Sequence, residues 1–181
     1  MFLKSLVLHN FRCFSDLTVN FNNRLTVIVG GNGAGKSTVL DAATIAAGTL
    51  TSAMDGLTNY GIKKGDAHYK CFDLGSNVDV QPQFPVEITA IGDVDGKEIT
   101  WTRNLNSAKG RGGLASAKPL TLVAESYQER MRSGDRELKL PIISEQGGSG
   151  LSIRRKRVIL SKRITEVTDI LTVWMALPMT N

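Results

Sequence analysis

The sequence is poor in the side chains that form disulfides and metal sites. Its 181 residues include only two cysteines and two histidines. Cys13 and Cys71 lie far apart and outside any C-x-x-C pattern, and no recognisable set of ligands accompanies His9 or His68. We therefore expect reduced thiols, with neither a disulfide framework nor a metal site built on these residues.

Long apolar runs are missing as well. No stretch approaches the ~20 residues that cross a membrane. The N-terminus MFLKSLVLHNF has neither the long apolar core nor the small-residue cleavage site of a signal peptide. These absences predict a cytoplasmic protein that does not enter a membrane. The net charge of +5 permits binding to a polyanion, and the 41% hydrophobic and 22% charged residues are typical of a globular chain.

The most informative stretch that is present runs from Gly30 to Ser37 and has the sequence GGNGAGKS. It fits the phosphate-loop pattern G-x-x-x-x-G-K-[ST]. The β-branched apolar run LTVIV at 25–29 predicts a strand before it. The apolar spacing after it predicts a helix that ends near Gly48 or continues to about Ala53. Strand, glycine loop and helix in this order are the arrangement that phosphate binding needs.

The residue types of this loop suit a phosphate, because glycines let successive N–H groups point inward with no Cβ in the way. We expect Lys36 to contact the β- and γ-phosphates as the catalytic cation, Ser37 to ligate Mg²⁺, and Thr38 to contact the α-phosphate. The predicted phosphate site comprises Gly30, Gly31, Asn32, Gly33, Ala34, Gly35, Lys36, Ser37 and Thr38. The alternative, a glycine-rich turn with an incidental lysine, is disfavoured because both flanking segments agree with a phosphate loop.

Alternating apolar and polar residues predict strands elsewhere in the chain. One strand is expected at about 2–9 and another at 17–21, so that an antiparallel pair leads into the segment that carries the loop. VEITAIG and KEITWTR, joined by a turn that contains Asp-Gly, predict a hairpin over 86–103. Trp101 of this hairpin is expected in the core, and stacking on adenine is the alternative.

The remaining segments give weaker signals. Residues 51–85 have little apolar periodicity and predict a loop with short elements, whose lysines face either solvent or nucleic acid. Pro119 to Arg132 predicts a helix, and LKLPII, which ends at Ile143, predicts a buried strand. Together the elements predict an α/β fold in which N-terminal antiparallel strands lead into a mixed sheet with flanking helices.

The segments LVLHNFRCFSDLTVNF and LTVIVGGNGAGKSTVLDAA resemble the N-terminal half of ABC-type P-loop ATPases of the RecF/SMC/SbcC class. This class includes the ATPases of overcoming-lysogenization-defect nucleases and of Septu and retron anti-phage systems. The resemblance covers about 1–143. It implies the N-terminal lobe of an ATPase domain that binds ATP and Mg²⁺ and acts in DNA repair or phage defence. It also implies a homodimer, with DNA or RNA and a nuclease subunit as partners. By the same resemblance Arg12, in the Asn-Phe-Arg motif, is a candidate contact to the γ-phosphate or to DNA; a plain surface arginine is the alternative.

Later motifs of these families are missing from the sequence. ILTV at 170–173 is not followed by the Asp-Glu pair of a Walker B strand, and Gly147 to Gly150 do not match the LSGG-like signature. We therefore expect this chain alone to bind ATP weakly and to hydrolyse it very slowly. A catalytically incomplete nucleotide-binding fragment is one alternative. Another P-loop enzyme, such as a nucleotide kinase, is a second, although no arginine-bearing lid is evident.

The tail at 144–181 differs in character from the rest. With permitted codons from Glu145 onward, a one-base shift of the reading frame can give GAGRLWAINKKK, and Septu-type ATPases have a similar glycine–arginine–leucine–tryptophan stretch directly after LP-[IV]-I. We therefore hypothesise that the chain is a truncated member of the family and that its atypical tail is translated from a shifted reading frame. A basic cluster in this tail is then accidental, and the alternative is a nucleic-acid patch on a helix. The cluster comprises Arg154, Arg155, Lys156, Arg157, Lys162 and Arg163.

Overall fold

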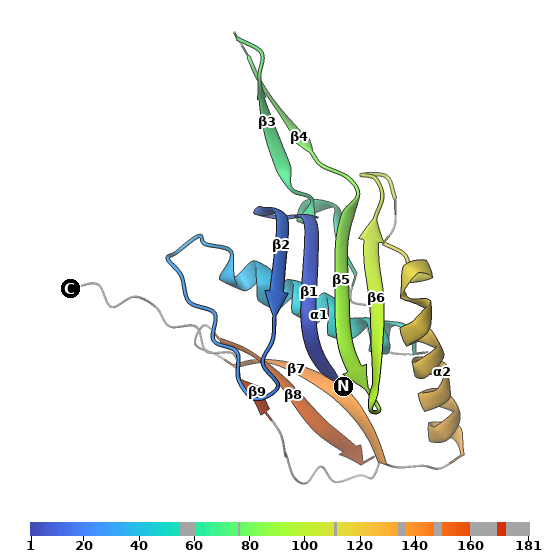
Figure 1. The fold of residues 1–181 in the computed structure, drawn as a ribbon. Helices are drawn as coiled ribbons and strands as arrows, with labels where there is room; N and C mark the ends of the chain where they lie inside the picture. Colours follow the sequence, from blue (N-terminus) through green and yellow to red (C-terminus); the bar gives the residue numbers. More distant parts are fainter. Residues whose placement is uncertain are drawn as a thin grey trace, which may run out of the picture.

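The computed structural model describes residues 1–54, 61–75, 77–110 and 112–133 with their side chains, and the backbone alone of 137–146, 150–159 and 170–172. An antiparallel sheet with the strand order β2-β1-β5-β6 forms its centre (Figure 1). The strands of this sheet are β1 (Phe2–Phe11), β2 (Phe14–Asn20), β5 (Val86–Val94) and β6 (Lys97–Leu105). In β5 every second residue is buried, so one face of the sheet is covered and the other is more open.

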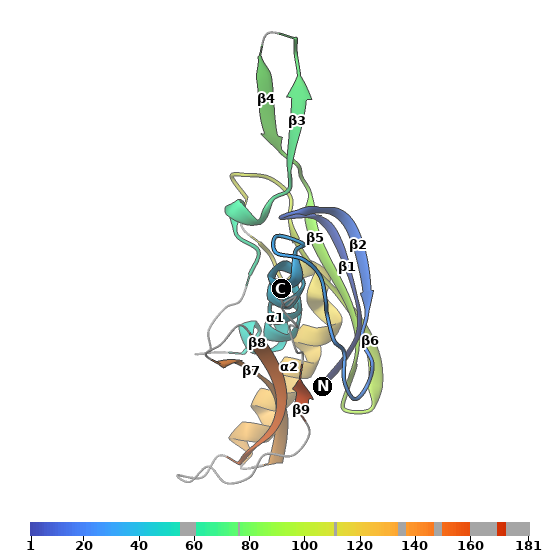
Figure 2. The same cartoon turned by 90° about the vertical axis from the view of Figure 1, so that its left-hand side faces the viewer.

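Two helices, α1 (Lys36–Ser52) and α2 (Lys118–Arg132), lie on the same face of this sheet (Figure 2). Helix α1 is rich in small residues and is buried on nearly every side, more than the single face that its periodicity predicted. Trp101 of β6 is 1% exposed, and its indole Nε1 donates a 3.0 Å hydrogen bond to the carbonyl oxygen of Ala46. The predicted core position of Trp101 is therefore confirmed. No helix in the described part of the chain is long and apolar enough to cross a membrane.

A two-stranded hairpin projects from this body as an arm (Figures 1 and 2). A 3₁₀ turn at Lys64–Asp66 precedes its strands, β3 (Tyr69–Asp73) and β4 (Val78–Pro82). The base of the arm is fixed to the end of β1, since the His68 amide donates to the Asn10 carbonyl at 2.8 Å. The sequence predicted only a loop with short elements here. All of β3 is exposed, and a strand without a buried face lacks the alternation that marks strands in a sequence.

A third antiparallel sheet is formed by β7 (Glu137–Gln146), β8 (Gly150–Ile159) and β9 (Ile170–Thr172). The strand expected around LKLPII is thus present. The basic run 154–157 lies on β8 rather than on a helix, so the helical interpretation of the cluster is wrong. The β-branched residues on either side of the run favour a strand, and the run pairs with β7. Lys162 and Arg163 lie outside the described residues.

The predicted fold class is confirmed, and the strands at 2–9 and 17–21, the hairpin at 86–103 and the helix at 119–132 all exist within one or a few residues of their expected bounds. Every strand pairing in the described ranges is antiparallel. The sequence therefore predicted the strands of the central sheet and its flanking helices correctly, while the described sheets are antiparallel rather than mixed.

A further predicted element is wrong: no strand forms at 25–29. The prediction came from the β-branched apolar run. In the structure the segment does alternate in exposure, because Leu25, Val27 and Val29 are 47%, 48% and 67% exposed while Thr26 and Ile28 are partly buried. A strand also needs a neighbour that completes its backbone hydrogen bonds, and no described strand pairs with this segment. The phosphate loop is therefore reached through an unpaired segment.

Candidate nucleotide phosphate site

The glycine loop turns into α1 at Gly35, and this turn tolerates no side chain. Gly35 caps the helix in a left-handed conformation with φ of 82°. A Cβ atom there would lie 2.7 Å from Sγ of Cys13 and 2.8 Å from Cε2 of Phe14. Both the dihedral angle and the close approach therefore require glycine. The connection between β1 and β2 is thereby packed directly against the loop.

The first turn of α1 presents unpaired amide groups to the same place. The Val39 amide donates to the Gly35 carbonyl at 3.1 Å, so the amides of Lys36, Ser37 and Thr38 precede the first helical hydrogen bond and have no partner inside the helix. These donors and the positive end of the helix dipole favour an anion. The local backbone is thus suited to a phosphate before any side chain is considered.

The Lys36 side chain folds over its own loop and is 9% exposed. Its Nζ donates to the carbonyl oxygens of Gly30 at 2.8 Å and Gly31 at 2.7 Å. An ammonium group has three donors, so the third can bind a phosphate oxygen. A phosphate would meet a lysine whose position is already fixed, which lowers the entropy cost of binding.

The loop and the connection after β1 line a cavity of about 400 Å³. This volume lies in the range of small-molecule sites. Arg12 and Cys13 line one side, and residues 32–38 line the other. The Cys13 thiol donates to Oγ1 of Thr38 at 3.6 Å and links the two sides.

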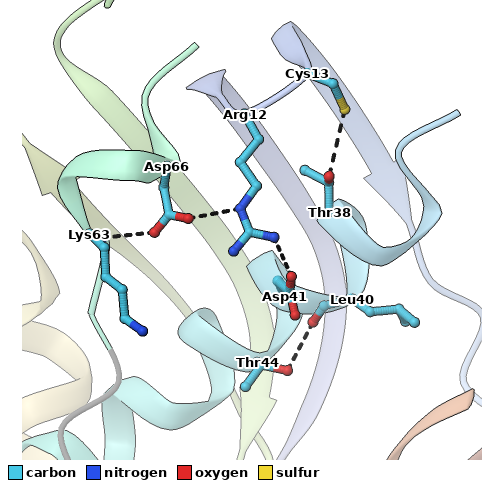
Figure 3. A network of polar contacts seen from close by, with 8 residues as sticks. All are labelled: Arg12, Cys13, Thr38, Leu40, Asp41, Thr44, Lys63 and Asp66. Atoms are coloured by element: carbon cyan, nitrogen blue, oxygen red, sulfur yellow. Dashed lines mark hydrogen bonds and ion pairs between the residues drawn. The ribbon is translucent and has the colours of Figure 1, made fainter. Parts of the chain in front are cut away.

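Arg12 reaches the cavity from a left-handed backbone position with φ of 52°. Two carboxylates hold its guanidinium (Figure 3): Nε donates to Oδ1 of Asp66 at 2.8 Å, and Nη1 donates to Oδ2 of Asp41. Burial lowers the pKa of Arg12, but the hydrogen bonds and charges of Asp66 and Asp41 outweigh it and raise the pKa above its ordinary value. The guanidinium therefore stays charged, with two negative charges facing its one positive charge.

The structure brings most of the predicted site residues together. Arg12 and residues 32–38 line one cavity, whereas Gly30 and Gly31 take part through the carbonyl groups that hold Lys36. The sequence prediction missed Cys13, Asp41 and Asp66. Cys13 directly follows Arg12, and Asp41 lies about one helical turn after Ser37, so adjacency and helical spacing could have found these two. Asp66 has no local signal.

The side chains of the cavity could bind Mg²⁺ only together with the phosphate oxygens of a nucleotide. Among the side chains that the structure describes, no group of three or more His, Cys, Asp or Glu could hold a metal ion. Ser37 is exposed and lines the cavity. Mg²⁺ at phosphate sites keeps several waters and takes phosphate oxygens as ligands, so a single hydroxyl from the loop is compatible with such a shared site.

Comparison with known proteins identifies the family of the chain. The sequence model of the AAA domain family matches residues 5–169, a range that continues past residue 143. The chromosome partition protein Smc of Halothermothrix orenii is 51% identical over 43 residues, 23% of this chain and 4% of that protein. The DNA replication and repair protein RecF of Pediococcus pentosaceus is 45% identical over 42 residues, 23% of this chain and 11% of that protein.

The DNA double-strand break repair Rad50 ATPase of Sulfolobus acidocaldarius is 37% identical over 65 residues, 36% of this chain and 7% of that protein. The matches to these three relatives thus span between 4% and 11% of their lengths. Among solved structures, the SMC head domain from Thermotoga maritima has a TM-score of 0.44 and 18% identity, and the match covers 85% of this chain and 62% of that one. Because the family model matches most residues of this chain, the chain belongs to the AAA domain family. It is similar to the Smc, RecF and Rad50 proteins.

Proposed function

We propose that this chain binds ATP with Mg²⁺ through residues 30–38 and is part of an ATPase that acts on DNA. One observation carries the proposal: loop amides, the Lys36 ammonium and the Arg12 guanidinium meet at one cavity of about 400 Å³. Converging donors of this kind suit a polyphosphate. The names of the relatives refer to chromosome partition, DNA replication and repair, and DNA double-strand break repair, which supports DNA as the partner of the complete protein.

The residues would have distinct roles. Bound Mg²⁺–ATP supplies the γ-phosphoryl group that is transferred to water. Lys36 would neutralise charge that develops on the β- and γ-phosphate oxygens. Ser37 would hold the metal, the Thr38 amide would bind the α-phosphate, and Arg12 would contact the γ-phosphate. Contact of Arg12 with DNA is the alternative.

Binding without turnover is the second candidate function, and one observation favours it. No Asp or Glu belongs to the described lining of the cavity, so the carboxylate that orients an attacking water has to come from elsewhere. Phosphate release by the 181-residue chain with Mg²⁺–ATP separates the two candidates. Turnover that Lys36→Ala abolishes would contradict the binding-only function, and release at the level of that variant would support it.

The wider setting is also a proposal. We infer a role in DNA repair or phage defence, a homodimer in the complete protein, a nuclease subunit as partner, and a cytoplasmic location. The shifted reading frame of residues 144–181 is a separate hypothesis. The DNA sequence of the gene tests it, because a neighbouring frame must continue into an Asp-Glu pair after a strand of four apolar residues. A gene without such a frame refutes it.

A titration with fluorescent ATP tests binding. Lys36→Ala should weaken the affinity by about 10- to 100-fold, because a charge-assisted hydrogen bond contributes about 1.5–3 kcal/mol. Removal of Mg²⁺ should weaken it as well. Lys97→Ala, which removes an exposed lysine at the β5–β6 turn, is the matched control and should bind ATP like the unmodified chain. Equal affinities for all three proteins would refute the proposed site.

A further inference from the structure

We propose that Asp41 occupies the place of a phosphate on Arg12 until a nucleotide binds, and that Asp66 is a positioning residue that holds Arg12 at the cavity. The inference rests on the proposed ATP site and assigns opposite roles to two carboxylates that bind the same guanidinium. Both contacts are seen in Figure 3. Their surroundings differ, and the difference decides which carboxylate can leave.

Asp66 is fixed in place. Its side chain is 7% exposed, and each of its oxygens has a partner. Oδ1 accepts from Nε of Arg12, and Oδ2 accepts from the Lys63 amide at 2.8 Å. Its main-chain carbonyl also accepts from the Arg12 amide at 2.8 Å. Moving this buried carboxylate would break both of its side-chain hydrogen bonds, which is costly, so Asp66 stays when the cavity fills.

Asp41 is free to leave. Its side chain is 40% exposed, and among the described residues Arg12 is its one hydrogen-bond partner. Water can solvate the released carboxylate, so its departure costs little. A carboxylate and a phosphate offer arginine the same kind of oxygen acceptors. A phosphate that enters the cavity and binds Nη1 of Arg12 therefore competes with Asp41.

The two carboxylates also act on each other through the guanidinium. Asp66 holds the Nε side and leaves Asp41 a contact with one terminal nitrogen. Without the Asp66 charge, the guanidinium can turn and form a bidentate pair with Asp41, which is the stronger geometry. Loss of Asp66 therefore weakens phosphate binding, whereas loss of the Asp41 charge removes a competitor and strengthens it.

Equilibrium titrations of the 181-residue chain with fluorescent ATP and ADP test this assignment. Asp41→Asn should tighten ATP binding by about three- to tenfold, and Asp66→Asn, whose amide oxygen can still accept from the Lys63 amide, should weaken it by a similar factor. Both effects should be smaller for ADP and should fall below about twofold in an Arg12→Ala background. Asp16→Asn is the matched control for charge, because this side chain is 74% exposed and outside the cavity lining.

Two features of the measured affinity changes separate a positioning role from a merely structural one: whether ATP binding becomes tighter or weaker, and whether the change disappears without Arg12. Unchanged or weaker ATP binding by Asp41→Asn overturns the inference, and so does an effect of either variant that persists without Arg12. If Asp66→Asn does not fold, as judged by thermal melting, Asp41→Asn with and without Arg12→Ala still decides. Binding that depends on Lys36 but not on Asp41 refutes this inference alone, whereas a chain that does not bind ATP refutes the proposed function and this inference together.

Discussion

Replacing Arg103 by methionine should stabilise this protein. Arg103 is 1% exposed and shares the buried face of β6 with Trp101 and Leu105. In the part of the chain that the structure describes, its Nε, Nη1 and Nη2 have no hydrogen-bond partner. Burial lowers the pKa of the Arg103 guanidinium below its ordinary value. Among the described residues, this cationic group of the core therefore has no compensating partner.

The size of the effect follows from the missing partners. A buried charge without compensation costs about 3–5 kcal/mol. Methionine keeps the unbranched stem that packs against the neighbouring side chains and removes all five donors. We expect Arg103→Met to raise the free energy of unfolding by about 3 kcal/mol. For a chain of this length that corresponds to a rise in Tm of about 6–12 °C.

Thermal melting and urea denaturation of the two proteins measure the change. Arg24→Met, at an exposed arginine, is the matched control and should shift the free energy of unfolding by no more than about 0.5 kcal/mol. A destabilisation of more than about 1 kcal/mol by Arg103→Met would refute the reasoning. It would mean that residues outside the described part of the chain supply Arg103 with a carboxylate.

Two further predictions concern the loop and the core. Gly35→Ala should abolish ATP binding and lower the Tm, because it adds a Cβ against Phe14 at a φ of 82°. Gly96→Ala, at a φ of 78° with nothing within 4 Å of the added atom, measures the conformational cost alone, about 1–2 kcal/mol, and an equal loss for both variants would contradict the packing argument. Trp101→Phe should cost about 1–2 kcal/mol by removing the hydrogen bond to Ala46; an unchanged urea midpoint would show that this bond contributes nothing.

Elements with a strong local signal were predicted correctly. The β5–β6 hairpin carries alternating residues on both sides of an Asp95-Gly96 turn, and both turn residues adopt positive φ. Glycine is favoured in this conformation because it lacks a Cβ atom, and aspartate because its short side chain can hydrogen-bond to the nearby backbone. Neither reason involves a distant residue. The phosphate loop is equally local, because glycine geometry and the start of α1 determine where its amides point. A short stretch of sequence is therefore sufficient to predict both the β5–β6 hairpin and the phosphate loop.

Two segments whose structure depends on a neighbouring strand were predicted incorrectly. The segment 25–29 has the β-branched apolar composition of a strand, yet it lacks a described neighbour for its backbone. The strands of the arm have the opposite property. They pair with each other from Tyr69 opposite Pro82 to Asp73 opposite Val78 but show no burial pattern in the sequence. Periodicity therefore reports which face is covered, whereas pairing depends on what lies alongside.

The same distinction applies to the candidate site. The residues that would hold a phosphate are consecutive, so the sequence predicted them as a group. The charge available to Arg12 depends on Asp41 and Asp66, which are 29 and 54 residues away. Helical spacing places Asp41 near the loop, but neither its contact with Arg12 nor that of Asp66 follows from a local pattern. A sequence motif thus identifies the arginine, but whether that arginine attracts an anion depends on two carboxylates that only the fold brings to it. The exposure of each carboxylate determines whether a phosphate can replace it on Arg12. The half-exposed Asp41 can be replaced, whereas the buried Asp66 cannot.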